Sequence, residues 1–206
     1  MILIYYLLIS LSSLSKELPS IIESYGYASV VVLMALESAS LPLPSEVILP
    51  TVGFLVEKGF MNFYIALIAA LIGSFIGIMV DYYIGYYLGK DFIYKNLRLF
   101  HIKKETLDDF DLWFDKNGEI AVFFSRMIPV IRGLISFPAG FANMDKRKFI
   151  TYSMVGSLIY DALLILFGMY ALSIGNIVEL MAAISIFAVL LIAVYKLFMH
   201  YLVKKK

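Results

Sequence analysis

Long apolar stretches alternate with shorter charged segments along the 206 residues of the chain. Three of these stretches, 63–80, 162–178 and 180–195, contain no charged residue. A helix needs about 20 mainly apolar residues to cross a bilayer, and each stretch reaches this length with slight extension. The pattern therefore predicts three spanning helices.

Two further apolar segments, 25–56 and 120–142, are interrupted by prolines. Proline lacks an N–H donor and clashes with the preceding turn, so each segment should form two half-helices or a re-entrant hairpin. Such backbone is tolerated at membrane depth where it is buried in protein or lines a wet cavity. The residues expected to shape the hairpins are Pro42, Pro44, Pro50, Pro129, Pro138 and Gly140. The alternative is a pair of kinked spanning helices whose charges form a structural salt bridge.

The two halves of the chain share a glycine spacing. Gly73 and Gly85 are 12 residues apart, and so are Gly156 and Gly168. One hairpin and one crossing in each half would make the halves inverted repeats, the architecture of many transporters with a site at the midplane. The expected fold class is an all-α polytopic membrane protein. It is an inverted repeat of two re-entrant hairpins, each followed by a spanning helix, plus a C-terminal spanning helix.

The predicted organisation has three parts. Residues 1–24 form an N-terminal apolar or interfacial segment, 25–172 the membrane domain, and 173–206 a C-terminal spanning helix with a basic tail. The membrane domain is expected to run through re-entrant segment 25–58, helix 60–89, connector 90–118, re-entrant segment 119–143 and helix 147–172. For residues 1–14, a span, an interfacial helix and a cleaved signal sequence all stay open.

Composition supports a membrane solvent. Hydrophobic residues make up 62% of the chain and charged residues 16%, whereas a soluble domain carries about a quarter charged residues. The absence of cysteine excludes disulfides, thiolate metal sites and cysteine nucleophiles. No hydrolytic or metal-binding motif is present. We therefore expect no enzyme activity, no catalytic residue, no cofactor, no metal and no nucleic-acid partner.

Basic residues indicate one orientation. If the connector 90–118 is cytoplasmic, the predicted crossings bring the basic clusters at 146–148 and 204–206 to the same side. This satisfies the excess of lysine and arginine in cytoplasmic loops. We expect a multi-pass protein of the cell (plasma) membrane with a cytoplasmic connector and C-terminus.

Charged residues inside the broken segments point to a transport site. Arg126 and Arg132 lie in the second segment, and Glu37 and Glu46 lie in the first. A charge at mid-membrane costs roughly 2.5–3.5 kcal/mol on insertion scales, so it usually faces a cavity, a partner or a substrate. Guanidinium groups pair bidentately with phosphate, and half-helix ends add N–H donors to an anion site.

Two motifs carry a family resemblance. The run Glu37-Ser-Ala-Ser-Leu-Pro-Leu-Pro-Ser-Glu46 and the run Phe124-Ser-Arg-Met-Ile-Pro-Val-Ile-Arg132, which is followed by Pro138-Ala-Gly140, resemble the DedA family. This is the SNARE-associated or VTT-domain group, and the resemblance covers roughly 25–170.

The resemblance implies two opposed re-entrant hairpins and movement of lipid across the bilayer. Bacterial members are associated with recycling the polyprenyl phosphate carrier and with proton-motive-force homeostasis. By motif, the functional acids of the family fall on Glu37 and Glu46, and its functional arginines on Arg126 and Arg132. Many members have a Gly-Asp pair in the helix after the first hairpin, but here Gly77 is followed by Ile78. The acids at the ends of two predicted spans, Asp81 and Asp161, are therefore only secondary candidates.

The favoured hypothesis is a flippase or scramblase for an anionic lipid, polyprenyl phosphate first and phospholipid next. Arg126 and Arg132 would bind the phosphate, while Glu37 and Glu46 would neutralise the empty site and take up protons in a proton-coupled cycle. Two alternatives stay open, a proton- or sodium-coupled carrier of a small solute and a non-transporting assembly or homeostasis factor. The expected partners are a membrane lipid with an anionic headgroup and, as options, protons and further copies of the chain.

Overall fold

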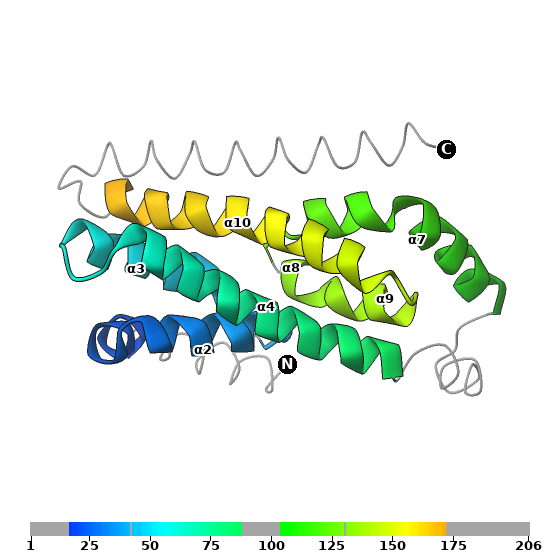
Figure 1. Ribbon diagram of the computed structural model, residues 1–206, viewed down its shortest axis with the longest axis horizontal. Coiled ribbons are helices and arrows are strands. Elements are labelled where there is room, and N and C mark those ends of the chain that lie inside the picture. Colours follow the sequence, from blue (N-terminus) through cyan, green and yellow to red (C-terminus); the bar gives the residue numbers. More distant parts are fainter. Residues whose placement is uncertain (1–16, 42, 88–103, 130, 172–206) are drawn as a thin grey trace, which may run out of the picture.

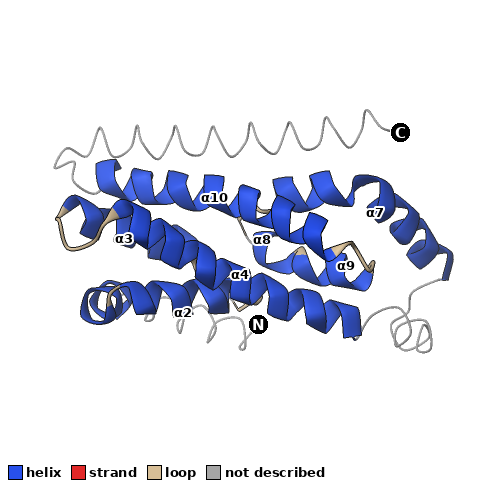
Figure 2. Cartoon of the chain, in the orientation of Figure 1, coloured by secondary structure: helices blue, strands red, loops and turns tan. Residues whose placement is uncertain are grey.

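The computed structural model describes residues 17–41, 43–87, 104–129 and 131–171, which form helices joined by short loops (Figures 1 and 2). No strand occurs in these ranges, so the prediction of an all-α protein is confirmed there. The predicted C-terminal spanning helix within 173–206 and the apolar residues 1–14 lie outside the described residues.

The elements are α2 (Tyr27–Ser38), α3 (Ser45–Glu57), α4 (Phe63–Tyr87), α7 (Lys104–Ser125), α8 (Ile131–Leu134), α9 (Ser136–Phe141) and α10 (Lys146–Ala171). Residues 17–25 are also helical. Two of the described helices are long and apolar enough to cross a membrane, namely α4 and α10. α4 lies within the range predicted for a helix at 60–89, and α10 overlaps the range predicted at 147–172.

The first broken segment is interrupted between α2 and α3. Ser40 has a φ of 59°, and Pro44 caps α3 with extended backbone at φ −82° and ψ 97°. Pro50 lies inside α3, where its nitrogen cannot donate to the carbonyl of Glu46, yet the helix continues to Glu57. The chain is therefore broken before Pro44 and not at Pro50. Pro42 lies outside the described residues.

The second broken segment contains two short helices. α7 ends at Ser125, a turn containing Pro129 follows, and α8 and α9 come in quick succession. Pro138 stands in the first turn of α9, where a missing N–H leaves no helical bond unmade. Upstream, α7 runs without interruption across the predicted boundary between 118 and 119.

Each broken segment packs against both long helices. In the first half, α2 lies on α4 and α3 lies on α10; in the second, α7 lies on α10 and α9 lies on α4. Figure 1 shows α4 and α10 running lengthwise, with α2 and α3 toward one end and α7 to α9 toward the other. The two segments therefore meet the same pair of helices in opposite order.

Glycines allow close backbone contact within each half. Gly73 of α4 faces the carbonyl oxygen of Val31 in α2, and Gly156 of α10 faces the carbonyl oxygen of Phe123 in α7. A Cβ atom at either glycine would come closer to that oxygen than real Cβ atoms do. Helices can approach this closely only where small residues line the contact.

The contacts between halves use glycines on both partners. Against α10, Gly53 of α3 meets the carbonyl of Ile165, and Gly168 of α10 meets the carbonyl of Pro50. Against α4, the matching contacts are Gly140 of α9 with the carbonyl of Tyr82 and Gly85 of α4 with the carbonyl of Phe137. The glycine spacing shared by the two halves therefore corresponds to the same set of helix contacts in each half.

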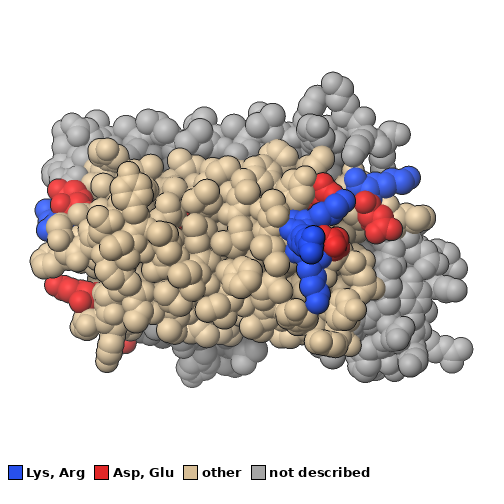
Figure 3. Space-filling view, viewed as in Figure 1, with Lys and Arg blue, Asp and Glu red and all other residues tan. Residues whose placement is uncertain are grey.

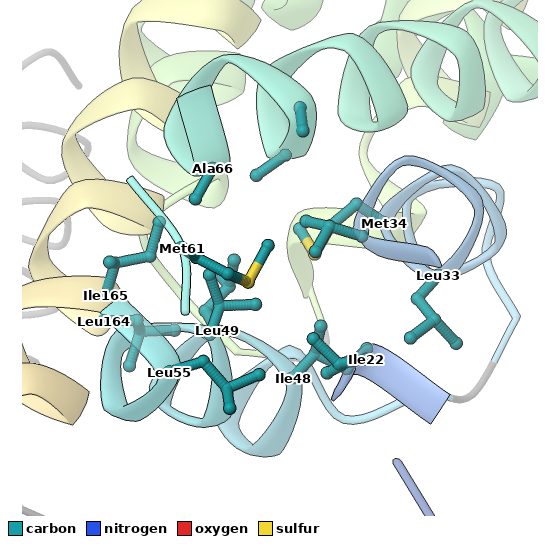
Figure 4. Close-up of a cluster of buried hydrophobic side chains, with 14 of the residues drawn as sticks. Ile22, Leu33, Met34, Ile48, Leu49, Leu55, Met61, Ala66, Leu164 and Ile165 are labelled. Carbon is teal, nitrogen blue, oxygen red and sulfur yellow. The ribbon is translucent and has the colours of Figure 1, made fainter. Parts of the chain in front are cut away.

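In the described part of the chain, the larger of two buried apolar clusters lies around the first broken segment, and the smaller includes Val122 and Ala139 of the second half. Figure 4 shows side chains from α2, α3, α4, α10, the helix at 17–25 and the loop before α4 converging in the larger cluster: Ile22, Leu33, Met34, Ile48, Leu49, Leu55, Met61, Ala66, Leu164 and Ile165. Large apolar side chains also lie on the outer surface, among them Ile68 of α4, which is 56% exposed. In Figure 3, charged side chains gather at the two ends of the visible face and leave its broad middle uncharged. An exposed apolar band of this kind is typical of a surface that contacts membrane.

Candidate functional site

Five charged side chains are buried where the two broken segments approach each other. Glu37 is 6% exposed, Asp81 5%, Arg126 0%, Arg132 1% and Asp161 0%. They come from α2, α4, the end of α7, α8 and α10. Because an isolated buried charge costs several kcal/mol, the partners of each group decide what it can do.

Arg132 is held between two carboxylates. Its Nη1 and Nη2 each donate to Asp161 Oδ1 at 3.1 Å. Its Nε lies 3.3 Å from Glu37 Oε1, an ion pair without the alignment of a hydrogen bond. The guanidinium also lies 4.5 Å from the centre of the Tyr160 ring. Arg132 therefore joins α2, α8 and α10 through its charge.

Glu37 is fixed by hydroxyl groups on both sides of the first break. Ser38 Oγ donates to Glu37 Oε2 at 3.0 Å, and Ser45 Oγ donates to Oε1 at 3.4 Å. Ser38 is the last residue of α2 and Ser45 the first of α3. The break thus brings both hydroxyl groups to one carboxylate.

Arg126 has no acidic partner in contact. Its Nη1 donates to the carbonyl oxygen of Arg132 and its Nη2 to Ser136 Oγ. Among the described residues, no carboxylate lies within ion-pair distance of it, and its Nε has no hydrogen-bond partner. The carboxylates of Glu37, Asp81 and Asp161 act on it only at longer range. Arg126 is therefore a buried cation with an available donor.

Asp81 meets the turn of the first broken segment. Its Oδ2 is hydrogen-bonded to Ser40 Oγ, which also lies 3.2 Å from the carbonyl oxygen of Gly133 in α8. This contact links α4 to both broken segments.

A domain-level comparison identifies the family. The family model for the VTT domain matches residues 43–171, which include four of the five buried charges. The chain belongs to the DedA/VTT family of membrane proteins. No solved structure matches the chain.

Relatives of this family member cover most of its length. Undecaprenyl phosphate transporter A of Bacillus subtilis is 32% identical over 196 residues, 95% of this chain and 97% of the relative. The protein of the same name from Staphylococcus aureus is 32% identical over 151 residues, covering 71% of this chain and 74% of that protein. Protein DedA of Escherichia coli is 26% identical over 167 residues, 77% of this chain and 75% of the relative. The family is transporter-like, which is consistent with the expectation of a membrane transporter.

The structure brings together most of the site residues that the sequence predicts. Arg126, Arg132 and Glu37 share the cluster, and Asp161, a secondary candidate, is a direct partner of Arg132. Glu46 is placed differently, because it is exposed and accepts a hydrogen bond from Tyr160 Oη at 2.9 Å.

The sequence did not predict Ser136 and Tyr160 as site residues, and it ranked Asp161 only as a secondary candidate. Asp161 is the one charged residue between positions 149 and 178. The argument that singles out the two arginines, a lone charge in an apolar stretch, could have found it. Within the described ranges, no group of three or more His, Asp or Glu side chains could hold a metal ion.

Proposed function

We propose that this DedA/VTT-family protein moves a lipid with a phosphate headgroup across the plasma membrane. Polyprenyl phosphate is the first candidate and bulk phospholipid the second. The names of the Bacillus and Staphylococcus relatives support the first choice, since both are called undecaprenyl phosphate transporters. The lipid would leave the protein as it entered, without covalent chemistry.

The environment of Arg126 is the observation that carries this proposal. A guanidinium group hydrogen-bonds two phosphate oxygens at once, and Arg126 has an unpartnered Nε and only neutral acceptors. A phosphate would supply the missing negative charge. Arg132 could bind phosphate only by giving up Glu37 or Asp161, so its role is to position Arg126 through its main-chain carbonyl.

In the bilayer, the segments 25–58 and 119–143 would enter from opposite faces as re-entrant hairpins. The matched glycine contacts of the two halves support an inverted arrangement, and the uncharged middle of the surface supports a lipid environment. The connector 90–118 and the C-terminus would be cytoplasmic, as the basic clusters predict. One chain supplies all five buried charges, so the proposed site requires no second copy.

A second candidate is a non-transporting assembly factor. The ion pairs of Arg132 with Glu37 and Asp161 favour it, because they tie three helices together without any ligand. The two candidate functions differ in the role of Arg126. A lipid transporter would use it to bind phosphate, whereas an assembly factor gives no reason for a buried cation without an acidic partner.

Reconstitution into liposomes with fluorescent polyprenyl phosphate and an internal pH dye tests the proposal. The wild type should move the lipid, and Arg126→Gln should do so about 10- to 100-fold more slowly, since a hydrogen bond to a charged group contributes about 1.5–3 kcal/mol. The exposed Lys58, paired with Glu57 at 3.3 Å, provides the control variant Lys58→Gln, which should match the wild type.

Three outcomes would contradict the proposal. Equal lipid movement by Arg126→Gln and wild type would remove the role of Arg126. A folded wild type that moves no lipid would favour the assembly factor. Dye responses without lipid movement would favour an ion-coupled carrier of a small solute.

A further inference from the structure

The hydroxyl group of Ser40 lies between two acceptors from different parts of the fold. On one side is the carboxyl group of Asp81 in α4, and on the other, at 3.2 Å, the carbonyl oxygen of Gly133 in α8. Ser40 itself belongs to the break between α2 and α3 and has a φ of 59°. This hydroxyl is therefore a direct polar link between the two broken segments.

Counting hydrogens shows what the link requires. A serine hydroxyl has one hydrogen, while a carbonyl oxygen and an ionised carboxylate can only accept. Ser40 cannot make a full hydrogen bond to Gly133 and another to an ionised Asp81 at the same time, because a shared hydrogen weakens both contacts. Both contacts are full hydrogen bonds only if Asp81 carries a proton, donates it to Ser40 Oγ, and leaves the Ser40 hydrogen for Gly133.

We propose that Asp81 is a proton-binding site, and that Asp81, Ser40 and the Gly133 carbonyl form a proton-dependent latch between the two broken segments. With Asp81 protonated, the latch is closed as in this structure. When Asp81 loses its proton, Ser40 turns its hydrogen to the carboxylate and the bond to Gly133 is lost. The turn at Ser40 and α8 can then move apart at this point, while the ion pair of Arg132 with Glu37 stays in place.

Other acids of the cluster are less suited to this role. Glu37 is tied to Arg132 and to two serine hydroxyls, and Asp161 accepts two hydrogen bonds from Arg132. Glu46 is exposed and accepts from Tyr160. Among the residues that the structure describes, Asp81 is the buried acid that has a hydroxyl partner and no cation within ion-pair distance.

The surroundings of Asp81 connect the latch to the phosphate. Among the described helices packed on α4, α2 brings Glu37 and α10 brings Asp161, both engaged by Arg132. α3 brings Glu46 and Glu57, which are exposed, and α9 has no ionisable side chain. Arg126 is the charged group whose field reaches Asp81. A cation favours the ionised carboxylate, so a phosphate that neutralises Arg126 would favour the protonated acid. This coupling rests on the proposed function, whereas the latch itself does not.

Distance measurements between the two broken segments test the latch. The chain has no cysteine, so Leu41→Cys and Leu134→Cys, at residues that are 48% and 53% exposed, can carry a pair of spin labels. In lipid nanodiscs without polyprenyl phosphate, the wild-type background should shift from long to short distances as the pH falls.

Two variants should abolish this pH dependence, one by fixing the short distance and the other by fixing the long distance. Asp81→Asn should keep the short distance at every pH, because an amide N–H can always donate to Ser40. Ser40→Gly should keep the long distance at every pH, and glycine accepts the φ of 59° without strain. Glu57→Gln, which changes an acid at the exposed end of α3, should behave as the wild type.

A pH-independent wild type, or an Asp81→Asn variant that keeps the wild-type pH dependence, would overturn the latch. Infrared difference spectra of wild type against Asp81→Asn provide a second measurement, since a protonated Asp81 gives a carboxylic-acid band that the variant lacks. Adding polyprenyl phosphate to the nanodiscs should move the wild-type change in spin-label distance to higher pH. In Arg126→Gln, the pH of this change should stay the same. A pH-dependent latch without that displacement would overturn the coupling to Arg126 while supporting Asp81 as the proton site.

Discussion

Arg132 lies between two carboxylates, whereas Arg126, six positions earlier in the chain, reaches only a carbonyl oxygen and a hydroxyl group. Both side chains are fully buried and both belong to the same broken segment. The difference comes from their neighbours. Arg132 faces α2 and α10, each of which brings an acid, and Arg126 faces Ser136 and the backbone.

The contrast distinguishes a cation that is paired within the fold from a cation that has no acid in contact. A buried pair is strongly destabilised when one partner is removed, because the other charge stays uncompensated. A buried cation without an acid in contact is already in that condition, so removing it should cost little stability. Under the proposed function, an anion from outside the chain supplies the partner that Arg126 lacks.

The largest expected effect belongs to Arg132→Gln. This change leaves Glu37 and Asp161 buried without their cation, so the free energy of unfolding should fall by about 3–5 kcal/mol. Chemical unfolding in detergent, followed by circular dichroism, measures it. Arg126→Gln is the matched control and should unfold at the wild-type denaturant concentration or above it. An equal loss of unfolding free energy in Arg132→Gln and Arg126→Gln would contradict the distinction between the two arginines.

A smaller effect is expected from Gly156→Ala, which leaves every charge in place. A Cβ atom at this position would lie 2.8 Å from Arg126 Cβ and 2.8 Å from the Phe123 carbonyl oxygen. Overpacking of this kind costs about 1–3 kcal/mol and would displace Arg126 from its acceptors. Unfolding and lipid transport should therefore both be impaired.

The control for Gly156 is its exposed neighbour Val155. Val155→Ala should change the free energy of unfolding by no more than about 0.5 kcal/mol and leave transport intact. If Gly156→Ala were as stable and active as this control, close approach of α7 and α10 would not be what positions Arg126.

The smallest expected effect is that of Tyr160→Phe. The ring remains beside Arg132, and only the hydrogen bond to Glu46 is lost, which contributes about 0.5–1.5 kcal/mol at most. Tyr160→Leu removes the ring as well and should cost more. Thermal unfolding of the two variants separates the hydroxyl group from the cation–π contact. Identical melting temperatures would show that the ring does not stabilise Arg132.

Local sequence patterns predict the helices well. The uncharged run 63–80 lies within α4, and the break around Pro44 is where proline and the extended backbone interrupt the chain. Pro50 is the counterexample, because a helix packed on both sides continues through a proline that an isolated helix would not tolerate. Packing decides such cases, and packing is not a local property.

The pairing of charges is less predictable for the same reason. Glu46 and Asp161 are both acids in apolar surroundings, and only the rotation of α10 about its axis brings Asp161, with Tyr160 beside it, toward Arg132. That rotation follows from glycine contacts such as Gly168 against the carbonyl of Pro50. A sequence shows the glycine but not the carbonyl opposite it.

The cross-packing of the two halves also restricts how the molecule can move. Because α3 is seated on α10 and α9 on α4, with glycine against backbone in both places, no flexible side chain can repack to absorb a tilt of either hairpin. A hairpin that tilts must carry with it the long helix of the other half. The two broken segments are therefore not mechanically independent. If the proposed transport cycle requires either segment to tilt, we expect the other half of the fold to take part in that movement.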